Sequence, residues 1–234
     1  MNKVDINGVN FFTTENTLDL IDTAVNNKKN LIAINLEKIL TESAELKRYY
    51  SDNIGYPDGV FAARSASKLL RKPVKKIRGV DLWIDVMKYA QRRHLRVFIY
   101  GSRQGVLDSA LRRLKEEGLN DVICQAFNGY EYPIEEISKA IIKSKPDIVL
   151  LALGSPKQEL VAVRLEKLWN CTYMGLGGSL DVYSGLVSDT PLWWRKLVGW
   201  EGLYRVFINM SNLSRWKRQL VVIKLIKAKL KGTL

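Results

Sequence analysis

Residues 146–181 constrain the fold more than any other part of this 234-residue chain. Two apolar runs of strand type, residues 147–153 and 172–176, are each followed by a glycine-containing loop. In an open parallel sheet the ligand binds beyond the carboxyl ends of the strands, where glycine lets the loop backbone approach a phosphate group. We therefore expect an α/β sheet in which these two strands are neighbours and their loops bind a nucleotide.

The first of these loops also carries a helix start. Ser155 can cap the helix, Pro156 suits its first position, and Gln158 falls at the third. From there the Gln158 side chain can return to the Ser155 backbone as a capping box. The alternative is that Gln158 contacts a ligand, and the sequence of the loop leaves both interpretations open.

Apolar runs alternate with amphipathic segments through the first 190 residues. This alternation predicts a Rossmann-like parallel sheet with helices on both faces. We expect strands at residues 31–35, 53–56, 96–100, 121–127, 147–153 and 172–176. We expect helices at residues 37–50, 59–71, 81–93, 105–117, 134–144 and 156–169.

The composition is that of a globular protein, with a hydrophobic fraction of 47%. The N-terminus lacks the basic and apolar regions of a signal peptide, and no window reaches about 18 uncharged apolar residues. We therefore expect a cytoplasmic chain that does not span a membrane. Cys124 and Cys171 lie in apolar runs and should be buried free thiols. His94, the single histidine, follows a basic helical segment, so we expect it at a helix end and expect no metal site.

Positive charge is concentrated at the C-terminal end. Residues 192–234 contain ten Lys and Arg residues against one acid, Glu201, and so carry +9 of the formal net charge of +13. This predicts an α/β domain at residues 1–191 and a basic appendage at residues 192–234. The partner of the appendage should be anionic: a membrane surface, a nucleic acid or a diphosphate.

The appendage also has an apolar helical face. The residues on this face are Leu213, Trp216, Leu220, Ile223 and Leu230, with basic residues around them. Such a helix suits the headgroup region of an anionic bilayer. The alternative is packing on its own domain or on a neighbouring subunit. The contiguous aliphatic residues favour a membrane as the partner. A nucleic-acid partner would instead require exposed aromatic residues between the charges, on which bases can stack.

Polar residues follow two of the expected strands. Asn35 ends the first strand, and Asp58 follows Tyr56-Pro57. A carboxylate at this point can reach an incoming hydroxyl as a general base. Pro-Asp-Gly is also a common turn tripeptide, and composition alone favours a simple turn over a base at Asp58.

Charged residues surround Gly79, just before an expected helix. Lys76 and Arg78 form a candidate phosphate clamp and Asp81 a candidate N-cap, unless all three are ordinary surface residues. Asp181, which follows a pair of glycines, can bind sugar or ribose hydroxyls or cap the next helix. Neither G-x-G-x-x-G nor a Walker A sequence occurs, which disfavours a dehydrogenase or a P-loop NTPase.

Six segments, in this order, resemble the WecG/TagA/CpsF family of bacterial glycosyltransferases (glycosyltransferase family 26) over about residues 5–220. They are Ala33-Ile-Asn-Leu-Glu-Lys, Tyr56-Pro-Asp-Gly-Val, Arg78-Gly-Val-Asp-Leu-Trp, Gly154-Ser-Pro-Lys-Gln-Glu, Tyr173-Met-Gly-Leu-Gly-Gly-Ser-Leu-Asp-Val and Gly199-Trp-Glu-Gly-Leu-Tyr-Arg. Within the family, the sequences of these segments are most similar to those of the enterobacterial branch that transfers N-acetylmannosaminuronic acid from UDP.

The resemblance implies a peripheral membrane enzyme at the inner face of the cytoplasmic membrane. Its reaction would be a metal-independent, inverting transfer of N-acetylmannosaminuronic acid or N-acetylmannosamine from a UDP donor to undecaprenyl-diphosphate-linked N-acetylglucosamine. The product would enter a cell-surface polysaccharide such as enterobacterial common antigen. No cofactor and no nucleic acid is expected, a homo-oligomer is compatible with the sequence, and UDP-glucose is the alternative donor.

The resemblance also assigns roles to residues. It places the catalytic base at Asp58. The expected donor contacts are Gly101, Gly154, Lys157, Gln158, Glu159, Gly177, Gly178 and Asp181. The expected acceptor or diphosphate contacts are Asn35, Lys76, Arg78, Asp81, Arg205, Arg215 and Arg218. The chain departs from the family pattern where threonine becomes Ala33, where arginine becomes Lys76, and where Arg-Ala-Pro becomes Asp189-Thr-Pro.

Overall fold

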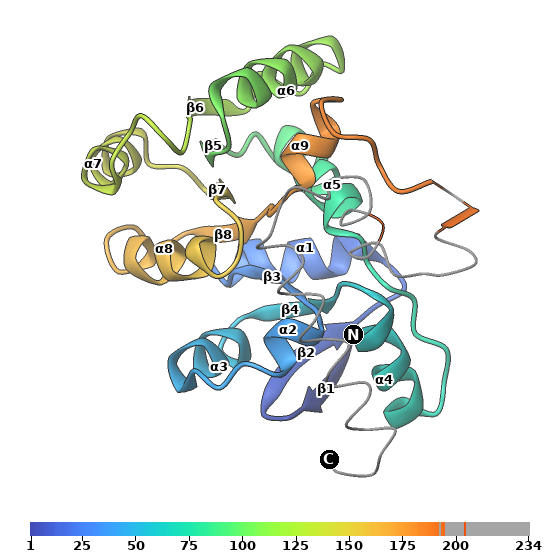
Figure 1. Cartoon of the computed structure of the whole chain (residues 1–234). Helices are drawn as coiled ribbons and strands as arrows, with labels where there is room; N and C mark the ends of the chain where they lie inside the picture. The colour runs from blue at the N-terminus through green and yellow to red at the C-terminus, as the bar shows by residue number, and fades with distance from the viewer. Residues whose placement is uncertain (192, 195–203, 205–234) are drawn as a thin grey trace.

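The computed structural model describes residues 1–191, 193, 194 and 204 (Figure 1). Within them, six parallel strands form one sheet in the order β4-β3-β8-β7-β5-β6, which confirms the expected fold class. The strands are β3 (Leu31–Ile34), β4 (Ile54–Pro57), β5 (Val97–Gly101), β6 (Ile123–Phe127), β7 (Ile148–Ala152) and β8 (Thr172–Gly175). As predicted, β7 and β8 are neighbours.

Helices cover both faces of the sheet. One face packs against α1 (Thr17–Asn26), α5 (Gly79–Arg93), α6 (Gln104–Glu116) and α9 (Ser179–Tyr183). The other packs against α3 (Ala44–Ser51), α4 (Val60–Leu70), α7 (Ile134–Ser144) and α8 (Lys157–Glu166). In Figure 1, α7, α8 and α3 lie on one side of the strands and α9, α5 and α1 on the other. Alternate residues of each strand enter the two cores, as in β5, where Val97 and Ile99 face one core and Phe98 and Tyr100 the other.

A hairpin that we did not predict precedes the sheet. The strands β1 (Asn2–Ile6) and β2 (Val9–Thr13) pair antiparallel around Asn7-Gly8, both of which have positive φ. Asn-Gly with this backbone is the preferred two-residue hairpin turn. The hairpin packs closely on β4, because a Cβ on Gly55 would lie 2.8 Å from the carbonyl oxygen of Asn10 and 2.9 Å from Cβ of Phe11.

The helix expected at residues 37–50 is instead two helices. The first is α2 (Leu36–Ile39), and α3 begins after Ser43, whose hydroxyl accepts a hydrogen bond from the Leu46 amide at 3.3 Å. This separate cap ends the continuity that the apolar spacing indicated. The short α2 matters for the site, because its first residues follow the end of β3.

Several smaller predictions can be compared with the structure. Cys124 and Cys171 are free thiols; Cys124 is half-buried, and Cys171 is buried, which raises its pKa to about 12. His94 ends α5 in the left-handed conformation, as expected of a helix-terminal residue. Among the residues described, no helix has both the length and the apolarity needed to cross a bilayer.

Candidate active site

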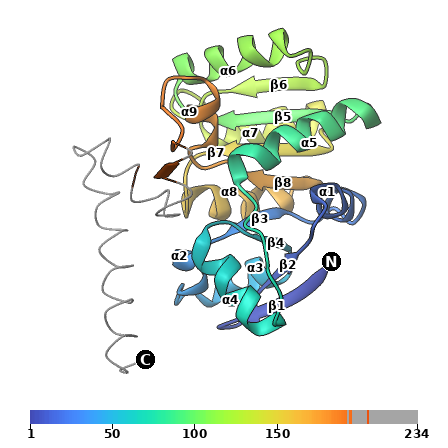
Figure 2. The ribbon, with the colours of Figure 1, turned by 90° about the vertical axis from the view of Figure 1, so that its right-hand side faces the viewer.

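The carboxyl ends of the parallel strands meet at one edge of the sheet. In Figure 2 the arrows of β5 and β6 lie across the view and point to the same side. The chain leaves β5 toward β6 and leaves β7 toward β8, in opposite directions along the sheet. A reversal of this kind opens the crevice in which α/β proteins bind ligands. The expected donor loops lie at this reversal or beside it.

Three of the predicted glycines, Gly101, Gly154 and Gly177, have positive φ angles that favour glycine. Gly101, at the end of β5, has φ +129°, and a Cβ there would lie 2.5 Å from the carbonyl oxygen of Ala152 in β7. Gly177 has φ +54° and follows β8. At Gly101 the absence of a Cβ therefore lets β5 end close to the β7 backbone, whereas at Gly177 it is the φ angle that favours glycine. Gly154 and Gly178 lie in the same loops, after β7 and before α9.

Gln158 joins two of these loops. Its side-chain Oε1 accepts a hydrogen bond from the Gly177 amide at 3.0 Å, and its Nε2 donates to Glu159 Oε1 at 3.2 Å. The side chain lies against Gly175, since a Cβ there would be 2.3 Å from Nε2. Of the two interpretations left open for Gln158, the capping box is not supported: Pro156 is the cap residue of α8, and no side chain among the described residues caps this helix.

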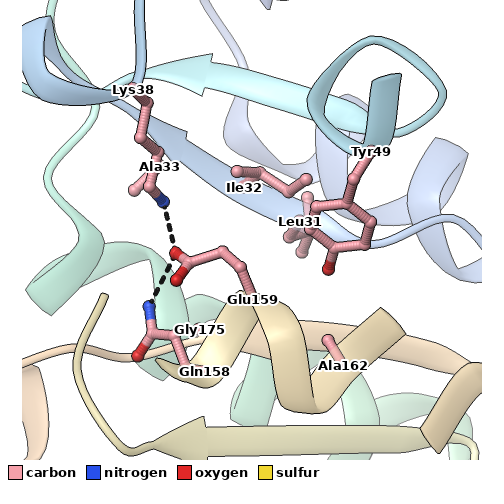
Figure 3. A pocket seen from close by; sticks show the side chains of 9 residues that line it. All are labelled: Leu31, Ile32, Ala33, Lys38, Tyr49, Gln158, Glu159, Ala162 and Gly175. Atoms are coloured by element: carbon pink, nitrogen blue, oxygen red, sulfur yellow. Dashed lines mark hydrogen bonds and ion pairs between the residues drawn. The ribbon is translucent and has the colours of Figure 1, made fainter. Parts of the chain in front are cut away.

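Glu159 points into the protein rather than toward the open edge. We predicted it as a donor contact, but its Oε1 accepts from Lys38 Nζ at 2.7 Å (Figure 3). The same oxygen also accepts from Ser155 Oγ at 2.6 Å. The Lys38 and Glu159 side chains are only 6% and 4% exposed. Direct contact between Glu159 and a donor is not supported by this burial. Lys157, next to it, is exposed at the start of α8 and stays a predicted donor contact.

The ion pair determines the charge state of Glu159. Burial opposes ionisation, but the Lys38 charge and the hydrogen bonds from Lys38 and Ser155 outweigh it, so the pKa of Glu159 is lowered from its usual value of 4.5. The pair also lines a cavity of about 10 Å³ together with Gln158, Ala33 and other residues of β3, α3, α8 and β8. At neutral pH the site thus contains a buried carboxylate whose charge depends on one lysine.

The ends of β3 and β4 carry the expected polar residues. Asn35 caps α2 by accepting a hydrogen bond from the Lys38 amide at 3.1 Å. Asp58 follows β4, its amide donates to the Ile34 carbonyl at 2.9 Å, and it is half-buried. Tyr56, in β4, is fully buried, and burial together with the Asp58 charge raises the pKa of its phenol. Asp58 therefore lies near enough to act on Tyr56 electrostatically.

The charged residues around Gly79 are already paired with each other. Arg78 Nη2 contacts both carboxylate oxygens of Asp189, at 2.7 and 2.9 Å, and Nη1 contacts Asp81 at 3.1 Å. The predicted N-cap role of Asp81 is wrong, because α5 begins at Gly79 and Asp81 lies in its first turn. Lys76 lies in the segment before it, which the Ile77 amide ties to Pro57 through a 2.8 Å hydrogen bond.

The remaining predicted residues have different outcomes. Asp181 lies in the first turn of α9 and is not its cap residue, because the cap position is Gly178. Arg205, Arg215 and Arg218 lie outside the described residues. Sequence reasoning missed the role of Lys38, which was visible only as part of the Asn-Leu-Glu-Lys segment.

Comparison with known proteins gives two results. The sequence model of the "Glycosyl transferase WecG/TagA/CpsF family" matches residues 3–233. A protein of Bacillus spizizenii, named N-acetylglucosaminyldiphosphoundecaprenol N-acetyl-beta-D-mannosaminyltransferase, is 34% identical over 177 residues. That alignment covers 75% of this chain and 67% of the relative. The family match therefore includes all of the loops described above as well as the basic C-terminal segment.

Proposed function

Because the chain belongs to the WecG/TagA/CpsF family and is a glycosyltransferase, we propose that it transfers N-acetylmannosamine or its uronic acid from UDP to N-acetylglucosaminyl-diphosphoundecaprenol. The name of the Bacillus spizizenii relative supports this acceptor and an N-acetylmannosamine-type donor. The product enters the synthesis of a surface polysaccharide. In this proposal the donor and the acceptor each carry a diphosphate, and both bind at the carboxyl edge of the sheet.

One observation carries this proposal: two chemically different loop sets meet at that edge. The β7 and β8 loops contribute glycine backbone, with Gln158 joining them at Gly177. The β3 and β4 ends contribute Asn35 and the Asp58 carboxylate. Backbone amides suit a nucleotide diphosphate, and a carboxylate suits the acceptor hydroxyl.

The proposed reaction is a single displacement with Asp58 as general base. Asp58 takes the proton of the acceptor hydroxyl as its oxygen forms a bond to the anomeric carbon. The bond from that carbon to the diphosphate oxygen breaks on the opposite face, and UDP leaves with the electron pair. The "beta" in the relative's name fits inversion of an α-linked donor. Cationic side chains and backbone amides stabilise the charge that develops on UDP.

The second element of this proposal is the basic segment at residues 192–234, which we expect to complete the site at the membrane. It carries ten Lys and Arg residues against Glu201. Docking of this segment on an anionic membrane surface brings Arg205, Arg215 and Arg218 to the diphosphate and places the enzyme at the cytoplasmic face. Deleting residues 192–234 should therefore abolish transfer to a lipid-linked acceptor.

The test is a donor screen with an Asp58→Asn control. UDP-N-acetylmannosamine, UDP-N-acetylmannosaminuronic acid and UDP-glucose are each offered with an undecaprenyl-type diphosphate acceptor. We expect turnover with one of the first two and a loss of about 10²- to 10⁴-fold in kcat for Asp58→Asn. Asp52→Asn, at an exposed position beyond α3, is the matched control and should retain full activity. Unchanged turnover in Asp58→Asn would overturn the assignment of the base.

A further inference from the structure

We propose that Lys38 and Glu159 act as a positioning pair, which holds Gln158 against Gly177 and so fixes the donor-binding loops after β7 and β8 relative to the end of β3. Neither residue needs to touch substrate. The identity of the molecules that the loops bind rests on the proposed function; the positioning role itself does not. The contacts that carry it are independent of any ligand.

The first step is the position of Glu159 Oε1, which receives three donors from different segments. Lys38 Nζ contacts it from α2 at 2.7 Å, Ser155 Oγ from the β7 loop at 2.6 Å, and Gln158 Nε2 at 3.2 Å. Figure 3 shows Lys38, Glu159 and Gln158 in line across the gap between α2 and α8. One carboxylate oxygen therefore joins the segment after β3 to the segment after β7.

The second step extends this connection to β8. Gln158 uses both ends of its amide: Nε2 donates to Glu159, and Oε1 accepts from the Gly177 amide at 3.0 Å. If Glu159 stopped accepting from Nε2, the amide would lose the contact that determines which end faces Gly177. Glu159 thus determines the orientation of the Gln158 amide, and this orientation presents Oε1 to the Gly177 amide in the β8 loop.

The third step connects the pair to the end of β3. Asn35 Oδ1 caps α2 by accepting from the Lys38 amide, so the residue that supplies the cation is itself fixed by a predicted acceptor contact. The strands β3 and β8 pair only at Leu31 and Met174 and have no paired residues nearer their carboxyl ends. The ion pair joins the segments that follow β3 and β7, the two strands that flank β8, near the point where this ladder ends.

The fourth step is electrostatic. Glu159 Oε2 is buried and has no hydrogen-bond partner among the described residues, so the carboxylate depends on what reaches Oε1. The charged or titratable groups facing it are Lys38 from α2 and the tyrosines 49 and 50 from α3, whose pKa values are raised, chiefly by burial, so both phenols are neutral. Without Lys38 the carboxylate would be an uncompensated buried charge.

The experiment compares Lys38→Met, Glu159→Gln and the double variant with Arg164→Met. Arg164 is also on α8, but its pair with Glu135 is exposed, at 57% and 63%, which makes it a matched control. We expect Lys38→Met to lower kcat/KM for the donor by about 10²-fold per folded molecule, as small displacements of a binding group do. The double variant should recover at least about ten-fold, because Gln at position 159 keeps the acceptor oxygen without the unpaired charge.

A second readout does not depend on activity. The Gly177 amide donates a hydrogen bond to Gln158 Oε1, which should slow its hydrogen exchange. In Lys38→Met this amide should therefore exchange at least about ten-fold faster than in Arg164→Met, and the double variant should restore the slow exchange. Unchanged Gly177 protection in Lys38→Met, or a double variant no better than the single one, overturns the positioning role. A wild-type enzyme that transfers no sugar while Gly177 responds as expected overturns the proposed function instead.

Discussion

Two ion pairs at the carboxyl edge of the sheet contrast with each other. Lys38–Glu159 is closed off from water, with side chains 6% and 4% exposed. The Glu159 carboxylate also accepts hydrogen bonds from two neutral donors, Ser155 and Gln158. In the Arg78–Asp189 pair, Nη2 contacts both carboxylate oxygens at 2.7 and 2.9 Å, and the Arg78 side chain is 13% exposed. Its carboxylate partners are more open to water, since Asp189 is 32% exposed and Asp81 is 64% exposed. The difference lies in solvent access rather than in distance.

This difference separates a structural contact from one that a ligand can replace. Breaking a buried pair leaves a charge with no water to solvate it, whereas a partly exposed pair exchanges its partner for water or for another anion at little cost. Lys38 and Glu159 therefore fit a fixed framework for the donor loops. Arg78 fits a group that exchanges carboxylates for a diphosphate during the proposed reaction.

The largest expected effect tests the buried pair. Lys38→Met should lower the free energy of unfolding by about 3–5 kcal/mol, because it strands the Glu159 carboxylate in the core. Lys38→Met/Glu159→Gln should be less destabilised than the single variant, with the difference measured by urea unfolding. Equal stability of Lys38→Met and wild type would mean that the pair is not desolvated in solution.

The second effect is the pH dependence of the same carboxylate. The pKa of Glu159 is lower in the folded protein than its usual 4.5, so its contribution to stability is complete above that value and is lost as pH falls through the folded pKa. Urea unfolding from about pH 7 to about pH 3 should therefore show a steeper loss of stability in wild type than in Glu159→Gln. Identical slopes below pH 4.5 would contradict the lowered pKa.

The third effect concerns the packing of Gln158. Gly175→Ala would place a Cβ 2.3 Å from Gln158 Nε2 and 2.7 Å from its Cδ, which forces the amide away from Gly177. We expect a loss of about 1–3 kcal/mol in unfolding free energy, typical of overpacking, and a larger relative loss of transfer activity. Gly105→Ala is the matched control: a Cβ there meets nothing within 4 Å, and the helix position favours alanine by about 0.5–1 kcal/mol. Equal effects in both variants would contradict the proposal that contact with Gly175 and Gly177 determines the orientation of Gln158.

The sheet was predictable because its strands are short, continuous apolar runs between turn residues, a pattern that burial on both faces imposes. The N-terminal hairpin was not recognised, although Asn7-Gly8 is a strong hairpin signal. The break between α2 and α3 was missed because residues 40–43 contain no Gly or Pro. There the Ser43 cap, rather than a helix breaker, ends the continuity.

The site was predictable to the level of loops but not of side-chain direction. Glycines at strand ends identified the edge of the sheet, since parallel strands must end together there. Gln158 and Glu159 are adjacent on one helix, however, and only the packing of α8 determines that Glu159 points to the interior. Its partner Lys38 is far away in sequence, so local patterns contain no trace of the pair.

The smallest effect tests the exposed pair. Asp189→Asn keeps an acceptor for Arg78 and removes one negative charge, so we expect at most about 1 kcal/mol of lost stability. Arg78 is one of the residues that we predicted to contact a diphosphate. Removing a competing carboxylate should then raise the affinity for UDP by up to about five-fold, measured by titration calorimetry at low salt. Asp81→Asn, at a more exposed partner of the same guanidinium, should change both quantities less. Weaker UDP binding by Asp189→Asn would mean that Asp189 supports the diphosphate site instead of competing with its ligand.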